Sequence, residues 1–130
     1  MVERFTDTSQ IKECAKYYIQ LLGLQDWRII YDLTDDFRED WAGMNERDYT
    51  SKIAKISIRK SMPQDKDMWV KQPHEEVLIH ELLHCKFINL SSDTVEGTMF
   101  EQVYHTLLDD MARAILKARY NLTDDYYYFE

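Results

Sequence analysis

The stretch VLIHELLHCKFI, residues 77–88, decides the fold of this chain because it combines a dense apolar pattern with two histidines. At roughly 100° per residue, its apolar side chains cover most of the circumference of a helix, which we expect from about residue 74 to residue 90. Only a narrow strip through Glu75 and Lys86 is expected to face solvent. The sequence therefore predicts a helix that is buried on most of its sides.

Two histidines of this helix, His80 and His84, are four residues apart and so lie on one face, nearly opposite the expected solvent strip. Interior imidazoles without partners cost free energy, and a metal ion supplies such a partner. The pattern HExxH is typical of zinc peptidases, in which the glutamate takes a proton from water on the metal. It predicts a Zn²⁺ site with His80 and His84 as ligands and Glu81 as the general base. The alternative is a buried helix whose histidines are satisfied by hydrogen bonds in the core.

A second strongly helical segment runs from roughly residue 94 to residue 119. Asp93 and Glu96 form a plausible capping pair at its start. Apolar residues at helical spacing predict a core stripe along it. The expected members of that stripe are Phe100, Val103, Leu107, Met111, Ala114 and Ala118.

This second helix is expected to supply a third metal ligand, because catalytic zinc usually has three protein ligands and one open position. Its candidates are Glu96, Glu101 and His105. A capping role explains Glu96 fully, whereas Glu101 shares an otherwise small or apolar arc with Leu108, Ala112 and Ile115. His105 lies at the margin of that arc. It remains an alternative ligand, a residue that orients a ligand, an oxyanion donor or a boundary histidine.

The upstream half of the chain predicts one helix and a small sheet. Apolar residues at helical spacing over residues 9–22 are followed by Gly23, a typical C-terminal signal. Residues 27–32 and 53–58 have strand character, and residues 41–49 form a weaker third strand. The expected class is α+β, with an N-terminal helix, about three strands and then two helices.

His80-Glu81-Leu82-Leu83-His84, followed by a helix bearing Glu101-Gln102-Val103, resembles the small gluzincin-type metallopeptidases found as single domains in bacteria and their phages. The resemblance implies zinc held by His80, His84 and Glu101, with Glu81 as the base. It also implies a zincin-like fold with a small, mostly antiparallel sheet. In such domains the strand before the active-site helix forms the cleft edge. Here residues 53–58 would therefore bind an extended peptide by β-augmentation.

Two classes of function follow from these residues. The first is a zinc-dependent endopeptidase that acts on a specific intracellular protein. The second is a non-catalytic interaction module, of bacterial or phage origin, in which zinc stabilises a small core. A structural site has no need of Glu81 and usually has a fourth protein ligand, and the sequence offers no convincing fourth ligand. The first class is therefore favoured.

Composition sets the outer limits of these predictions. The chain has 130 residues, 45% of them hydrophobic, which suits one domain over residues 1–130. Its net charge of −8 disfavours nucleic acid and anionic membranes as partners. The polar start and the absence of an 18-residue apolar run favour a cytoplasmic protein with a peptide or protein substrate, and we expect a monomer. Cys14 and Cys85 are expected to be reduced thiols on helices, and Cys85 is expected to pack in the core.

Smaller features carry weaker expectations. The acidic and aromatic tail, residues 120–130, is too apolar for a solvated end, and one hypothesis places it in the cleft, where it would limit substrate access. His74 is expected to face solvent at the helix start. No spacing argument ranks the candidate oxyanion donors, which are Tyr31, Tyr49 and Tyr104.

Overall fold

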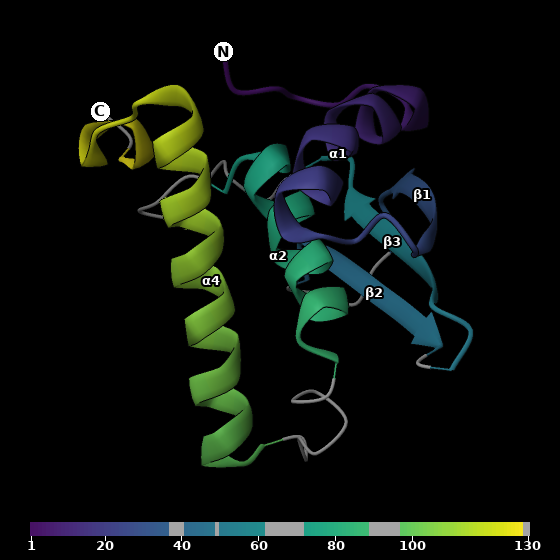
Figure 1. Cartoon of the computed structure of the whole chain (residues 1–130). Coiled ribbons are helices and arrows are strands. Elements are labelled where there is room, and N and C mark those ends of the chain that lie inside the picture. The colour runs from purple at the N-terminus through teal and green to yellow at the C-terminus, as the bar shows by residue number, and fades with distance from the viewer. Residues whose placement is uncertain (37–40, 49, 62–71, 89–96, 129–130) are drawn as a thin grey trace.

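The computed structural model describes residues 1–36, 41–48, 50–61, 72–88 and 97–128, and it has the α+β class that the sequence predicts. The elements run in the order α1 (Thr8–Leu22), β1 (Arg28–Thr34), β2 (Gly43–Asp48), β3 (Ile53–Arg59), α2 (His74–Lys86), α4 (Met99–Tyr120) and the short 3-10 helix η1 (Asp124–Tyr127) (Figure 1). No helix among these residues is long and apolar enough to cross a membrane.

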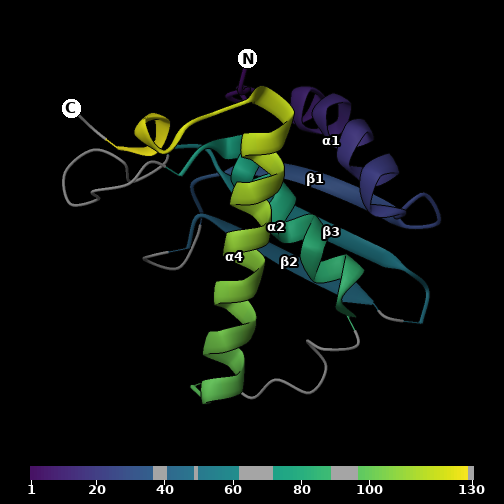
Figure 2. The ribbon, with the colours of Figure 1, turned by 60° about the vertical axis from the view of Figure 1, so that its left-hand side comes forward.

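Helix α2 is the centre of the molecule. It lies between α4 and the three-stranded sheet, and α1 packs beside it on the same face of the sheet (Figures 1 and 2). Its apolar side chains are buried around nearly the whole helix, which confirms the expectation drawn from its sequence. Helix α1 also ends as predicted, at Gly23 in the left-handed conformation with φ of 72°. The histidine motif is therefore held by packing on several sides.

The sheet differs from the expected one in two respects. Its order is β1-β3-β2, with β1 parallel and β2 antiparallel to β3, so the sheet is mixed and not mostly antiparallel. Strand β3 is central, so the expectation that residues 53–58 form the cleft edge is wrong. The physical reason is main-chain pairing: β3 pairs with β1 on one side and with β2 on the other, so it has no free edge for a peptide. The edge strand that packs against α2 is β2, whereas the other edge strand, β1, packs against α1.

The start of α2 is buried, although the sequence predicted it to face solvent. Glu75 has no exposed surface, and its carboxylate accepts hydrogen bonds from the hydroxyls of Tyr18 and Tyr120 and pairs with Arg119 at 2.9 Å. Because a cation and two hydroxyls replace water, the carboxylate can be buried. His74 is also buried, with Nδ1 accepting from the backbone N–H of Phe5 at 2.9 Å. The predicted solvent strip is thus confined to Lys86.

Helix α4 turns a different face to the core from the predicted one. Phe100, Val103 and Leu107 are exposed, whereas the buried residues are Tyr104, Leu108, Ala112 and Leu116. The true face is rotated by one residue, or about 100°, from the predicted stripe. The predicted face and the observed face of α4 both carry apolar residues at helical spacing. The contact with α2 determines which of the two is buried. Thr98 caps the helix by accepting from the N–H of Glu101, while the predicted capping pair, Asp93 and Glu96, lies outside the described residues.

The described part of the tail folds back against the helices. After α4 ends at Asn121, with φ of 53°, residues 124–127 form η1, and Tyr127 is buried. The ring centroid of Tyr127 lies 4.4 Å from the guanidinium of Arg113, which in turn pairs with Glu76 at 3.6 Å. The expectation that the tail is too apolar for a solvated end is confirmed for Tyr127, whereas Tyr128 is exposed.

Candidate metal centre

An open cleft of about 620 Å³ runs between β2, α2 and α4. Its walls come from segments far apart in the sequence, and no described residue of the tail lines it. The placement of the tail in the cleft is therefore not seen for residues 124–128. The lining residues are Trp41, Ala42, Gly43, Met44, Asn45, Arg47, Gln72, Glu76, Val77, His80, Glu81, His84, Glu101, Tyr104, His105 and Asp109.

The two histidines of the motif converge in this cleft. His80 and His84 occupy successive turns of α2, and their Nε2 atoms are 3.2 Å apart. Two nitrogens bound to one tetrahedral zinc at about 2.0–2.1 Å would be separated by about 3.3 Å. The pair is therefore spaced as one metal ion requires, with no movement of the helix, and 3.2 Å is also a hydrogen-bond distance between the two ring nitrogens.

The other ring nitrogens are held by α4. His84 Nδ1 lies 3.1 Å from the hydroxyl of Tyr104, and His80 Nδ1 lies 2.8 Å from a carboxylate oxygen of Asp109. The His80 contact has the distance of an ion pair without the angle of a hydrogen bond. Contacts of this kind fix the orientation of a histidine and direct its free nitrogen toward a metal.

His105 joins the two motif histidines and forms a cluster with them. Its ring stacks on that of His80, with centroids 5.9 Å apart, and meets that of His84 at 5.1 Å. The three imidazoles offer ligand atoms that all lie within 4.8 Å of one another. Glu101 lines the cleft one turn earlier, but its carboxylate accepts from the backbone N–H of Gly97 at 2.9 Å and is not part of this cluster.

The general-base candidate, Glu81, is buried where β2 comes closest to α2. A Cβ atom on Gly43 would lie 2.9 Å from a carboxylate oxygen of Glu81 and 2.6 Å from Val77, so only glycine allows this approach. Asn45, two residues along β2, donates to the backbone carbonyl of Glu81 at 2.6 Å. The strand thus fixes both the backbone and the side chain of Glu81.

Burial sets the protonation of the site. It raises the pKa of the Glu81 carboxyl to about 7, which suits a group that must accept and release a proton near neutral pH. Burial also lowers the pKa of His84 far below its ordinary value and lowers that of His105. For His80, burial lowers the pKa, but Asp109 and Glu81 outweigh it and raise the value. His84 and His105 are neutral imidazoles, which is the form that binds metals.

The remaining candidates from the sequence lie elsewhere. Tyr31 is on β1, the strand farthest from β2, and Tyr49 and Glu96 lie outside the described residues. Tyr104 lines the cleft and contacts His84 through its hydroxyl. Cys85 is buried beside Asn45 and takes no part in the histidine cluster.

The residues of the site that sequence reasoning missed include Gly43, Asn45, Arg47 and Asp109. A signal for Asp109 was present, because residues 101, 105 and 109 are spaced four apart and so share one face of α4. The residues of β2 had no such signal, since their role depends on which strand lies beside α2.

A second group of potential ligand residues, Glu3, Cys14 and Glu75, lies at the other end of α2. The backbone N–H of Glu3 donates to Glu75 at 2.9 Å, and Arg119 already neutralises the Glu75 carboxylate. These interactions satisfy the buried charge without a metal ion.

Comparisons of the chain with protein-family models, with curated proteins and with solved structures return no match.

Proposed function

We propose that this protein is a zinc-dependent endopeptidase with a zincin-like active site. The observation that carries the proposal is the convergence of the His80 and His84 Nε2 atoms, 3.2 Å apart, beside the buried carboxylate of Glu81 in an open cleft. A pair of metal ligands next to a base in a water-accessible site is the arrangement that hydrolysis requires.

The third ligand in this proposal comes from α4. The resemblance implies Glu101, whereas the position of His105 within the histidine cluster supports His105. The two residues are four apart on one helix face, so either can reach a metal held by α2. We favour His105, because the Glu101 carboxylate already serves the N-terminus of α4.

Each residue has a defined task in this reaction. Bound zinc would polarise the scissile carbonyl and lower the pKa of water toward about 7. Glu81 accepts the proton from that water and delivers it to the leaving amine. Asp109 and Tyr104 hold His80 and His84 in their ligand orientation. Strand β2 is an edge strand, so its outer side offers main-chain groups to an extended peptide.

The alternative is a zinc-stabilised interaction module without catalysis. It would need a closed site with four protein ligands, and among the described residues the cluster holds three histidines and opens onto the cleft. It would also give no role to the carboxylate of Glu81, which is buried and forms no ion pair with a described residue. The catalytic proposal accounts for both features.

The test is metal content together with peptide cleavage. Wild type and Glu81→Gln should each hold about one zinc, His105→Ala should lose it, and only wild type should cleave unfolded protein. Zinc retained in His105→Ala and lost in Glu101→Ala would make Glu101 the third ligand. Zinc bound without cleavage of any peptide would favour the interaction module, and no zinc after reconstitution would overturn both functions.

A further inference from the structure

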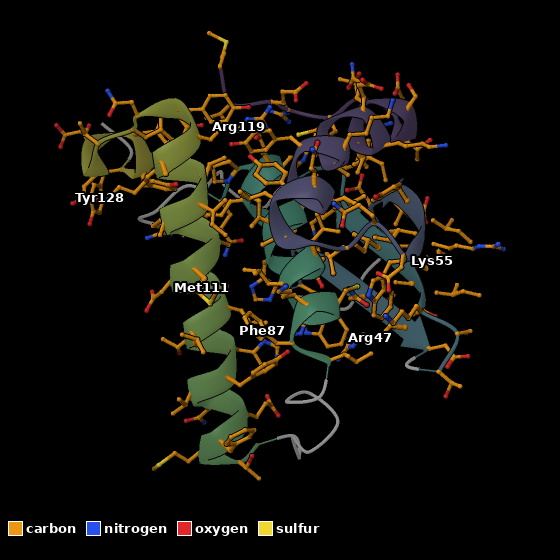
Figure 3. The ribbon with its side chains drawn as sticks, viewed as in Figure 1. Arg47, Lys55, Phe87, Met111, Arg119 and Tyr128 are labelled. Carbon is orange, nitrogen blue, oxygen red and sulfur yellow. The ribbon has the colours of Figure 1, made fainter. Side chains whose placement is uncertain are left out.

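Strand β2 presents three residues toward the cleft, and one of them has no role in holding the fold. Side chains alternate along a strand, so Gly43, Asn45 and Arg47 project to the same side. Gly43 and Asn45 both serve the contact with Glu81. Arg47 also lines the cleft, and Figure 3 shows it beside the C-terminal end of α2.

Arg47 forms no ion pair with a described residue, unlike the other arginines packed on α2. Arg119 pairs with Glu75 at 2.9 Å and Arg113 with Glu76 at 3.6 Å. Arg47 is half-buried, and its contact among the described residues is a weak bond from Nη1 to the carbonyl of Asn45 at 3.3 Å. No described carboxylate lies within ion-pair distance of it. Most of its five N–H donors therefore remain available to a ligand.

Arg47 is also close enough to act at the site of chemistry. It projects to the same side of β2 as Asn45, which donates to the backbone carbonyl of Glu81, and it lines the same cleft as Glu81, His84 and His105. It is the sole lysine or arginine among the described residues that line the cleft, whose other charged groups include four acids. A guanidinium in a partly desolvated wall binds carboxylates in two-point geometry more strongly than it would in water.

We propose that Arg47 is the binding site for a carboxylate of the substrate, so that the enzyme prefers peptides with a negative charge close to the scissile bond. This inference rests on the proposed peptidase function and deepens it. The carboxylate can come from an acidic side chain or from the C-terminus of the peptide. The shared chemistry is an anion that the guanidinium fork can bind.

The test compares short, internally quenched peptides of one neutral sequence. The reference peptide is amidated, one arm carries a single glutamate moved along the sequence, and the other arm leaves the neutral peptide with a free C-terminal carboxylate. Cleavage is measured with zinc-loaded wild type. Affinity is measured by fluorescence polarisation with zinc-loaded Glu81→Gln, alone and combined with Arg47→Gln.

We expect one carboxylate arm to bind about tenfold more tightly than the reference, with the gain in KM and not in kcat. Arg47→Gln should abolish the gain, read as the ratio of KM between the charged and the neutral peptide within each variant, and Arg47→Lys should restore part of it. Arg28→Gln is the matched control, because Arg28 lies on β1, which is not adjacent to β2, and should keep the full preference. The peptide arm whose affinity increases identifies the source of the carboxylate.

Three results would overturn the inference. Equal affinity for all peptides in wild type would remove it while leaving the peptidase function intact. A fall in kcat for the neutral peptide in Arg47→Gln, with the preference unchanged, would make Arg47 a group that stabilises the transition state. Failure of wild type to cleave any peptide would overturn the peptidase function, and this inference with it.

Discussion

Helix α2 buries three carboxylates, and two of them, Glu75 and Glu81, have opposite surroundings. Glu75, in the first turn, accepts from two tyrosine hydroxyls and a backbone N–H and pairs with Arg119. Glu81, two turns later, faces the cleft, and no described residue donates to its carboxylate. A buried carboxylate with hydrogen bonds and an ion pair stabilises the fold. A buried carboxyl group without them has a raised pKa, and such groups are typical of functional sites. The difference separates the structural end of the helix from its chemical centre.

The largest expected effect is on the rate of peptide cleavage, and it tests the contrast between Glu75 and Glu81. Glu81→Gln removes the proton acceptor but keeps the size and position of the side chain, so peptide cleavage should fall by about 10²–10⁴-fold. Its free energy of unfolding should stay the same or rise, because a buried charge without a partner is lost. Steady-state kinetics and urea unfolding on the same sample measure the two quantities. A large loss of stability would show that Glu81 has a structural partner.

The counterpart at the other end of α2 is Glu75→Ala. It leaves the partly exposed guanidinium of Arg119 without its carboxylate and the buried hydroxyl of Tyr18 without its acceptor, and we expect a loss of about 1–3 kcal/mol in unfolding free energy. Urea denaturation followed by circular dichroism measures this loss. The double variant Glu75→Ala with Arg119→Ala should recover part of it, since it removes the stranded charge. No recovery would mean that the tyrosine hydroxyls, and not the ion pair, hold this end of the helix.

A third test concerns the strand that holds Glu81 in place. Gly43→Ala introduces a methyl group 2.6 Å from Val77, which forces β2 away from α2. Overpacking of this kind costs about 1–3 kcal/mol of stability. Cleavage should fall more than stability explains, because the carboxylate loses its fixed position. The control is Gly97→Ala, where nothing lies within 4 Å of the added methyl group but the positive φ of 83° causes backbone strain. Loss of cleavage in the control as well would refute the positional argument.

The smallest expected effect is that of Asp109→Asn. The substitution removes the negative charge 2.8 Å from His80 Nδ1, and such outer contacts typically change metal affinity by about 10–100-fold. Competition with a zinc chelator measures the affinity. Asp110→Asn, the neighbouring acid on α4, is the matched control and should leave it unchanged. Equal affinities in the two variants would show that Asp109 does not orient the ligand.

Much of the candidate site could be predicted from local spacing alone. A separation of four residues on a helix places His80 and His84 on one face whatever surrounds them. The placement of Glu101 and His105 on one face of α4 follows in the same way. Whether Glu101 or His105 lies against the motif histidines depends on the rotation of α4 about its axis. Helix α4 has two apolar faces, and the predicted core face was wrong by one residue.

The sequence by itself determined the α+β class, the buried helix with its histidine pair and the end of α1 at Gly23, because each follows from interactions within a few residues. Only the tertiary structure decided that β3 is central, that Glu75 and His74 are buried and that β2 carries Arg47 into the cleft. These features depend on partners far along the chain, such as Arg119 for Glu75 and Phe5 for His74. Periodicity records which side of an element is apolar, but it does not record which neighbour will cover that side.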